Sequence, residues 1–215
     1  MILRSGLIVS AQARADNPLH GPVHMAAMAR AAEQAGAVAI RANGGADIAA
    51  IRDAVGLPVL GIVKRLDSGD PVYITPDLAA VEEAASAGAQ VIGLDATDRP
   101  RATPWREVLG AIHAAGCESF ADISTFDEGM AAAEAGAAYV GTTLAGHTEA
   151  TRGRSPDLAL VERLARAGVR VVAEGGFDTP ALAAEAMARG AHAVVVGTAI
   201  TNPREITRGF VRALA

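Results

Sequence analysis

The stretch Ala188–Gly197, which reads Ala-Arg-Gly-Ala-His-Ala-Val-Val-Val-Gly, decides the fold. Its Gly190 ends an Ala-rich helical pattern, because glycine reaches positive φ without a Cβ clash. The apolar run that follows has no polar alternation, which is typical of a strand covered on both faces, as in a parallel sheet. The same helix–glycine–strand unit occurs at 34–41, 86–95, 134–142 and 166–174.

Three further apolar runs complete a set of eight strands. They lie at Gly6–Ser10, Pro58–Val63 and Ser119–Asp122, and the last two follow helical patterns around Asp47–Ala54 and Trp105–Ala115. Eight strands that alternate with helices predict an α/β protein, a single-domain (β/α)₈ TIM barrel formed by all 215 residues. An open doubly wound sheet is the alternative, and it is disfavoured because no Gly-x-Gly-x-x-Gly motif follows the first strand.

Three helix starts have a hydroxyl residue directly before a proline. They are Thr75-Pro76, Ser155-Pro156 and Thr179-Pro180. We expect each hydroxyl to cap a helix whose first position is the proline.

The composition excludes several classes of protein. The net charge is −5 and aromatic residues make up only 3 %, so the basic face and stacking rings of a nucleic-acid binder are missing. No apolar stretch is long enough to span a membrane, and the first ten residues lack the pattern of a signal peptide. One cysteine, Cys117, excludes an internal disulfide framework. We therefore expect a cytoplasmic protein without nucleic-acid or membrane partners.

Lys64 is the only lysine among the 19 basic residues. Arginine stays protonated, whereas burial and neighbouring cations can tune a lysine amine until it loses its proton near neutral pH. Since Lys64 follows the apolar strand at Pro58–Val63, we interpret it as a catalytic residue. The alternative is an ordinary surface lysine.

Polar residues end nearly every apolar run. In a TIM barrel the carboxyl ends of the strands carry the active site, so this ring of polar residues predicts one. In chain order the ring consists of Gln12, Arg41, Lys64, Asp95, Asp122, Thr142, Glu174 and Gly197-Thr198.

The third and seventh strands lie opposite each other in a ring of eight. Lys64 and Glu174 would therefore face each other across the mouth, and a carbon between them could lose a proton to one group and regain it from the other. That arrangement suits epimerisation or isomerisation next to a carbonyl. A simple Lys–Glu ion pair is the alternative.

The loops after the seventh and eighth strands carry Gly175-Gly176 and Gly197-Thr198. TIM barrels often bind phosphate there through backbone N–H groups that glycine exposes, so these loops predict a phosphate site. Ordinary turn glycines are the alternative. The five histidines share no metal-ligand spacing, and we expect no metal. An exposed loop pair is the default interpretation of Arg99 and Arg101, and contact with the substrate is the alternative.

Seven motifs together resemble the N-acylglucosamine-6-phosphate 2-epimerase family, also called N-acetylmannosamine-6-phosphate epimerases. Their order and approximate spacing hold from Leu7 to about Thr207. They are Gly61–Arg65, Val72–Pro76, Leu94–Arg101, Ala121–Ser124, Gly141–Gly146, Val172–Gly175 and Val195–Thr201.

The resemblance implies a cofactor-free, metal-free and usually dimeric barrel enzyme of sialic-acid catabolism. Such an enzyme interconverts N-acetylmannosamine 6-phosphate and N-acetylglucosamine 6-phosphate at C2. Lys64 would be the acid/base and Glu174 its catalytic companion, while Gln12, Arg41 and Asp122 match sugar-contacting positions. The phosphate cradle would consist of Gly175, Gly176, Gly197 and Thr198.

Three positions depart from the family pattern. Asn202 stands where a phosphate-binding arginine is common, and Arg204 is a candidate to replace it. Gly176 stands in place of a Lys or Arg, and His147 in place of a Tyr. These departures leave open the exact sugar, its acyl group and the anion.

The proposed chemistry has neutral Lys64 remove the C2 proton, with Arg41 and Arg65 lowering the lysine pKa. The sequence leaves open whether Glu174 returns the proton or only positions the sugar. Two other functions fit the same residues. Lys64 could form the Schiff base of an aldolase. The barrel could instead bind a sugar phosphate and regulate a partner without turnover.

Overall fold

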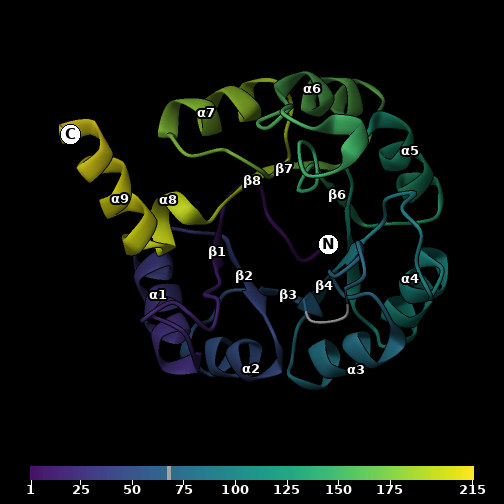
Figure 1. The fold of residues 1–215 in the computed structure, drawn as a ribbon. Helices are drawn as coiled ribbons and strands as arrows, with labels where there is room; N and C mark the ends of the chain where they lie inside the picture. The colour runs from purple at the N-terminus through teal and green to yellow at the C-terminus, as the bar shows by residue number, and fades with distance from the viewer. Residues whose placement is uncertain (67–68) are drawn as a thin grey trace.

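The computed structural model describes residues 1–66 and 69–215. Within these residues eight parallel strands form a closed barrel in chain order, and the last strand pairs with the first (Figure 1). This closure confirms the predicted TIM barrel and excludes the open doubly wound sheet. The strands are β1 (Gly6–Ala11), β2 (Ala39–Asn43), β3 (Val59–Ile62), β4 (Val91–Asp95), β5 (Glu118–Asp122), β6 (Tyr139–Gly141), β7 (Val171–Ala173) and β8 (Ala193–Val196).

Helices surround the barrel between successive strands (Figure 1). They are α1 (Pro22–Gln34), α2 (Gly45–Ala54), α3 (Leu78–Ser86), α4 (Trp105–Ala114), α5 (Phe126–Glu134), α6 (Leu158–Arg166) and α7 (Pro180–Ala188). A short 3₁₀ helix, η2 (Glu149–Thr151), precedes α6, and α8 (Thr198–Thr201) and α9 (Pro203–Leu214) follow β8. None of the helices in the described part of the chain is long and apolar enough to cross a membrane.

Alternate strand residues point into the barrel, and this period of two decides which side chains reach its mouth. Ala39 of β2 and Val172 of β7 belong to a buried cluster in the barrel interior. Two residues further along the chain stand Arg41, still on β2, and Glu174, directly after β7. The strands therefore place these charged side chains directly above an apolar floor.

The capping prediction is right at one helix and wrong at two. The Thr179 hydroxyl caps α7 by accepting a hydrogen bond from the Leu182 N–H. At α3 and α6 the cap is instead the aspartate after the proline, Asp77 and Asp157 respectively. A carboxylate accepts from the helix N–H groups at least as well as a hydroxyl does, so the helix begins after it. The displaced hydroxyl residues are Thr75 and Ser155.

His192 directly precedes β8 and lies at the end of the barrel opposite the mouth. Its Nε2 lies 3.0 Å from the Leu3 carbonyl oxygen, and its ring stacks on Tyr139. The Tyr139 hydroxyl accepts a 2.9 Å hydrogen bond from the Leu3 N–H. These contacts lie at the amino end of the barrel, away from the predicted site at the carboxyl ends of the strands.

Helix α9 begins beside the mouth of the barrel and then extends away from it (Figure 1). None of its residues is buried. Phe210, Val211 and Leu214 are 69 %, 61 % and 88 % exposed. The helix therefore presents apolar side chains without a partner in the described chain.

Candidate active site

The carboxyl ends of the strands surround a cavity of about 720 Å³. Nine of the residues predicted for the site line it: Gln12, Arg41, Lys64, Glu174, Gly175, Gly176, Gly197, Thr198 and Arg204. Two predicted residues, Asp122 and Thr142, are fully buried and do not belong to its wall.

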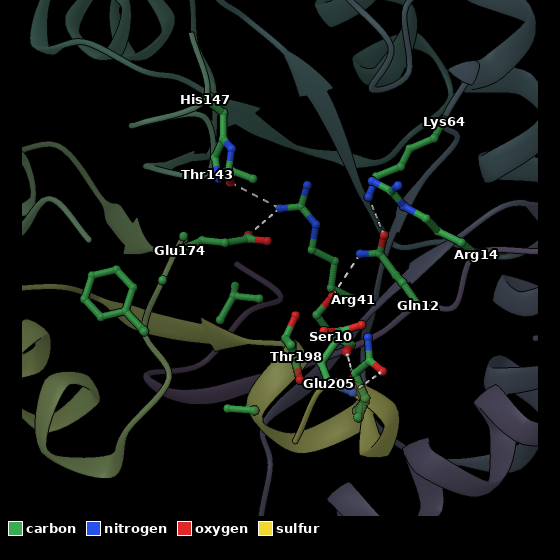
Figure 2. Close-up of a pocket in the computed structure, with 18 of the residues that line it drawn as sticks. Ser10, Gln12, Arg14, Arg41, Lys64, Thr143, His147, Glu174, Thr198 and Glu205 are labelled. Atoms are coloured by element: carbon green, nitrogen blue, oxygen red, sulfur yellow. Dashed lines mark hydrogen bonds and ion pairs between the residues drawn. The ribbon is translucent and has the colours of Figure 1, made fainter. Parts of the chain in front are cut away.

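Lys64 follows β3 and extends its side chain into the cavity (Figure 2). Its Nζ donates a 2.8 Å hydrogen bond to Oε1 of Gln12, and the Gln12 amide nitrogen donates in turn to the Ser10 hydroxyl at 2.9 Å. The backbone N–H of Lys64 donates to Oδ1 of Asn43 at 2.9 Å. The lysine is therefore held at both its backbone and its amine.

Burial is the largest cause that lowers the pKa of Lys64, from 10.5 to about 8, and the guanidinium of Arg41 lowers it further. Glu174 and Asp122 act in the opposite direction, and Arg14 adds a second cationic contribution. Arg65, which the sequence suggested for that role, instead pairs with Glu83 at 2.9 Å and is 41 % exposed. With a pKa near 8, part of the Lys64 population is neutral at physiological pH.

Arg41 is the buried cation that pairs with both carboxylates of the site, Asp122 and Glu174. Its side chain is 1 % exposed and forms paired hydrogen bonds of 2.9 and 2.8 Å with the carboxylate of Asp122. The same guanidinium bonds Glu174 at 2.5 Å. It lies over the Phe120 ring, 5.1 Å from the ring centroid. Burial opposes the charged form, but the two carboxylates outweigh it and raise the pKa of Arg41.

The Phe120 ring lies close to the backbone of β6. Gly141 of β6 faces it, and a Cβ on Gly141 would lie 2.2 Å from the ring. The glycine thus permits the close approach of β6 to the aromatic ring that supports the guanidinium.

Glu174 extends into the cavity from the side opposite Lys64, with Arg41 between them (Figure 2). Burial raises the pKa of Glu174, Arg41 lowers it, and the negative charge of Asp122 raises it again, so that the net shift is upward. The Thr142 hydroxyl fixes the backbone at Glu174, since it donates to the Glu174 carbonyl at 2.9 Å and accepts from the Glu174 N–H at 3.0 Å.

Three predicted strand-end residues do not reach the cavity. Asp122 supports Arg41 from behind, and Thr142 holds Glu174 through its backbone. Asp95 bonds the Thr97 hydroxyl and pairs with Arg99 and Arg101, which fold the loop after β4. The polar groups of Asp122, Thr142 and Asp95 therefore form hydrogen bonds and ion pairs with other protein groups and do not face the cavity.

The expected phosphate loops present glycine backbone to the cavity. Gly175 and Gly176 have φ of 101° and 75°, and a Cβ on Gly176 would lie 2.7 Å from the Ser155 hydroxyl oxygen. Gly197 and Thr198 line the cavity where β8 leads into α8. The left-handed backbone at Gly175 and Gly176 favours glycine over other residues.

Arg204 contributes a guanidinium to the cavity wall. Its Nη1 donates to the Asp16 carbonyl at 2.9 Å, and its Nη2 lies 3.2 Å from the Asp16 carboxylate. Asn202 also lines the cavity, but its side chain caps α9 by accepting from the Glu205 N–H. Arg208 of α9 adds another guanidinium to the wall.

Sequence reasoning missed several lining residues, namely Ser10, Arg14, Tyr73, Thr143 and Arg208. Ser10 could have been found from the period of two, because it precedes Gln12 by two residues. Thr143 follows Thr142 and bonds both Asp122 and Arg41. The others lie in loops or on α9, whose orientation the strand pattern does not predict. No group of three or more potential metal ligands occurs within residues 1–66 and 69–215.

The comparisons with known proteins agree with this geometry. A family model described as "Putative N-acetylmannosamine-6-phosphate epimerase" matches residues 25–215. Proteins of Escherichia coli O9:H4 (strain HS) and Shigella flexneri, both described as "Putative N-acetylmannosamine-6-phosphate 2-epimerase", are 49 % identical over 209 residues. Each match covers 97 % of this chain and 91 % of the relative.

Solved structures place the chain in the same group. The N-acetylmannosamine-6-phosphate 2-epimerase from Clostridium perfringens superposes with a TM-score of 0.94 at 40 % identity, covering 99 % of this chain and 94 % of that one. Thiamine phosphate pyrophosphorylase from Pyrococcus furiosus, with a TM-score of 0.63 and 16 % identity over 95 % of this chain and 90 % of its own, shares the fold alone. By sequence and by structure, the chain belongs to the N-acetylmannosamine-6-phosphate epimerase family.

Proposed function

We propose that this protein interconverts N-acetylmannosamine 6-phosphate and N-acetylglucosamine 6-phosphate by removing the C2 proton and returning it on the opposite face. The observation that carries the proposal is the placement of Lys64 and Glu174 on opposite sides of one cavity (Figure 2). Their pKa values shift toward each other, down for Lys64 and up for Glu174. Compared with the same groups in water, these shifts favour the neutral amine of Lys64 and the protonated carboxyl of Glu174, the forms that accept and donate a proton.

The proton at C2 becomes acidic when the sugar ring opens and C1 is a carbonyl. The neutral Lys64 amine accepts this proton, an enolate forms across C1 and C2, and the protonated Glu174 delivers a proton to the other face. In the reverse reaction the carboxylate accepts and the Lys64 ammonium donates. Arg41 lines the cavity between the two groups and places a fixed positive charge beside the enolate.

The phosphate is proposed to lie against Gly175, Gly176, Gly197 and Thr198. Glycine backbone N–H groups can approach an anion closely. Asn202 carries no charge, and the guanidiniums that α9 brings to the cavity wall are those of Arg204 and Arg208, which also pair with Asp16 and Glu205. We propose Arg204 as the replacement for the family arginine.

Proton exchange at C2 tests the proposed function. When N-acetylmannosamine 6-phosphate is incubated with the protein in D₂O, we expect N-acetylglucosamine 6-phosphate to appear with deuterium at C2. Proton NMR measures this as loss of the C2–H signal. Tight binding without exchange or a new epimer would contradict the proposal, as would a borohydride-trapped adduct on Lys64.

We also propose that the protein is a homodimer that buries the apolar face of α9. Phe210 and Leu214 are four residues apart, so they share one face of the helix, and both are exposed in the single chain. An exposed apolar face of this kind marks a protein interface, and a second copy of the chain supplies a matching face.

Substituting Phe210 and Leu214 together with Glu is expected to convert the dimer into a monomer, because two buried charges would face each other across the interface. Multi-angle light scattering after gel filtration measures the mass. Arg212→Glu, on the opposite face of α9, is the matched control and should leave the dimer intact. A monomeric wild-type protein would refute this proposal.

A further inference from the structure

Thr75 has an unusual backbone conformation. It is the one residue other than glycine with positive φ, 43°, among residues 1–66 and 69–215. A β-branched side chain is strained there, because its Cβ crowds the neighbouring carbonyl oxygen. Strained residues of this kind persist only where the surroundings hold them in place. Thr75 is 1 % exposed, so protein groups alone supply that support.

The support comes from Val63, the residue directly before Lys64. The Thr75 hydroxyl accepts a 3.1 Å hydrogen bond from the Val63 N–H. The Thr75 N–H donates to the Val63 carbonyl at 2.8 Å. Both backbone groups of Val63 are therefore satisfied by one residue, which fixes the peptide planes on either side of Val63.

Where β3 ends, the chain stops pairing with β2 and pairs with the segment 73–75 instead. Ile62 still pairs with β2, whereas Lys64 forms an antiparallel bridge with Ile74. The Arg65 N–H donates to the Tyr73 carbonyl at 2.9 Å, and the Ile74 carbonyl accepts from the Asp95 N–H of β4 at 3.0 Å. The segment 73–75 is thus anchored to the barrel and holds the residues on both sides of Lys64.

We propose that Thr75 is a positioning residue for Lys64, because its hydroxyl and N–H hold the backbone of Val63, directly before the lysine, at the cost of a strained φ. This inference rests on the acid–base function proposed for Lys64. Thr75 does not line the cavity, whereas Lys64 does, so any effect of Thr75 on the reaction passes through the lysine.

The kinetic test compares three variants. Thr75→Val keeps the shape but removes the hydroxyl, so the Val63 N–H loses its acceptor and Lys64 can shift. We expect kcat to fall about 10- to 100-fold, as for a misplacement of roughly 1 Å, with KM within about threefold. Thr75→Ser should retain wild-type kcat. Thr179→Val removes the capping hydroxyl of α7 and is the control. It should lower the stability of the protein without moving Lys64.

A second readout does not depend on turnover. Because Lys64 is the only lysine, the rate at which acetic anhydride labels its amine can be followed by mass spectrometry of one peptide. In the wild type this rate should rise with a midpoint near pH 8. Thr75→Val should move the midpoint upward, toward the 10.5 of a hydrated lysine. The charged groups that face Lys64 stay unchanged in the variant: Arg41 on β2, Arg14 after β1, Asp122 on β5 and Glu174 after β7.

The outcomes separate this inference from the proposed function. A shifted labelling midpoint in a protein that epimerises no sugar would leave the positioning role standing and refute the function. An active enzyme in which Thr75→Val keeps kcat and the midpoint, or loses kcat only as much as Thr179→Val, would overturn the positioning role. If Thr75→Val does not fold, Thr75→Gly tests the positioning role instead. Glycine removes the hydroxyl and relieves the backbone strain, and this variant should show the same loss of kcat.

Discussion

Replacing Lys64 with arginine is expected to lower kcat by about 10²- to 10⁴-fold, the usual contribution of a general acid–base group. Arginine keeps the positive charge but cannot give up its proton, so it cannot accept the one at C2. Turnover of N-acetylmannosamine 6-phosphate and deuterium exchange at C2 should both be lost. Exchange at the wild-type rate in Lys64→Arg would show that another group removes the proton.

The wild-type pH profile follows from the same lysine. One direction needs the neutral Lys64 amine with protonated Glu174, and the other needs the Lys64 ammonium with the Glu174 carboxylate, so both directions use a pair that holds one proton. Above about pH 8 the pair loses that proton, so kcat/KM should fall there equally in both directions. Both directions are measured on one protein, and a level profile above about pH 8 would show that Lys64 does not hold the shared proton.

Stability gives an independent view of Lys64. A lysine with a pKa of about 8 in the folded state and 10.5 in the unfolded state destabilises the fold when it is protonated, by about 3 kcal/mol. Lys64→Met should therefore be more stable than the wild type at pH 7, and the difference should shrink as pH rises from 8 to 10.5. Urea unfolding at several pH values measures it. Arg65→Met, beside it but paired with Glu83, should show no such pH dependence.

Replacing Arg41 with methionine is expected to destabilise the protein by about 3–5 kcal/mol, the usual cost of leaving a buried ion unpaired. The substitution removes the cation that Asp122 and Glu174 share. For a chain of this size the thermal midpoint should fall by roughly 6–20 °C. Activity should also be lost, because Glu174 loses its partner and the enolate loses its positive charge.

Two further variants show whether the lost charge of Arg41 causes the loss of stability in Arg41→Met. Arg166→Met removes an exposed ion pair with Glu162 and should change stability by less than about 1 kcal/mol. Adding Asp122→Asn to Arg41→Met removes the orphaned carboxylate and should restore part of the lost stability. An Arg41→Met protein as stable as the wild type would show that Arg41 is not what compensates these carboxylates.

The barrel and most of its mouth follow from local patterns. The repeated glycine before an unbroken apolar run predicts each buried strand, and the period of two then brings Arg41 and Glu174 to the mouth. The position of Asp122 does not follow from this, because a bidentate pair with Arg41 keeps it behind the cavity wall. Nor does the orientation of Tyr73 follow, because it depends on the antiparallel bridge between Lys64 and Ile74, which lies outside the repeated pattern.

Gly141 limits how this site can be re-engineered. Even alanine would place a methyl group against Phe120, and the ring cannot retreat because Arg41 lies over its face. Mutant libraries intended to broaden sugar selectivity are therefore best directed at Tyr73 and His147, which border the cavity. Randomising position 141 would mostly yield inactive clones, although that residue has no side chain to offer a substrate.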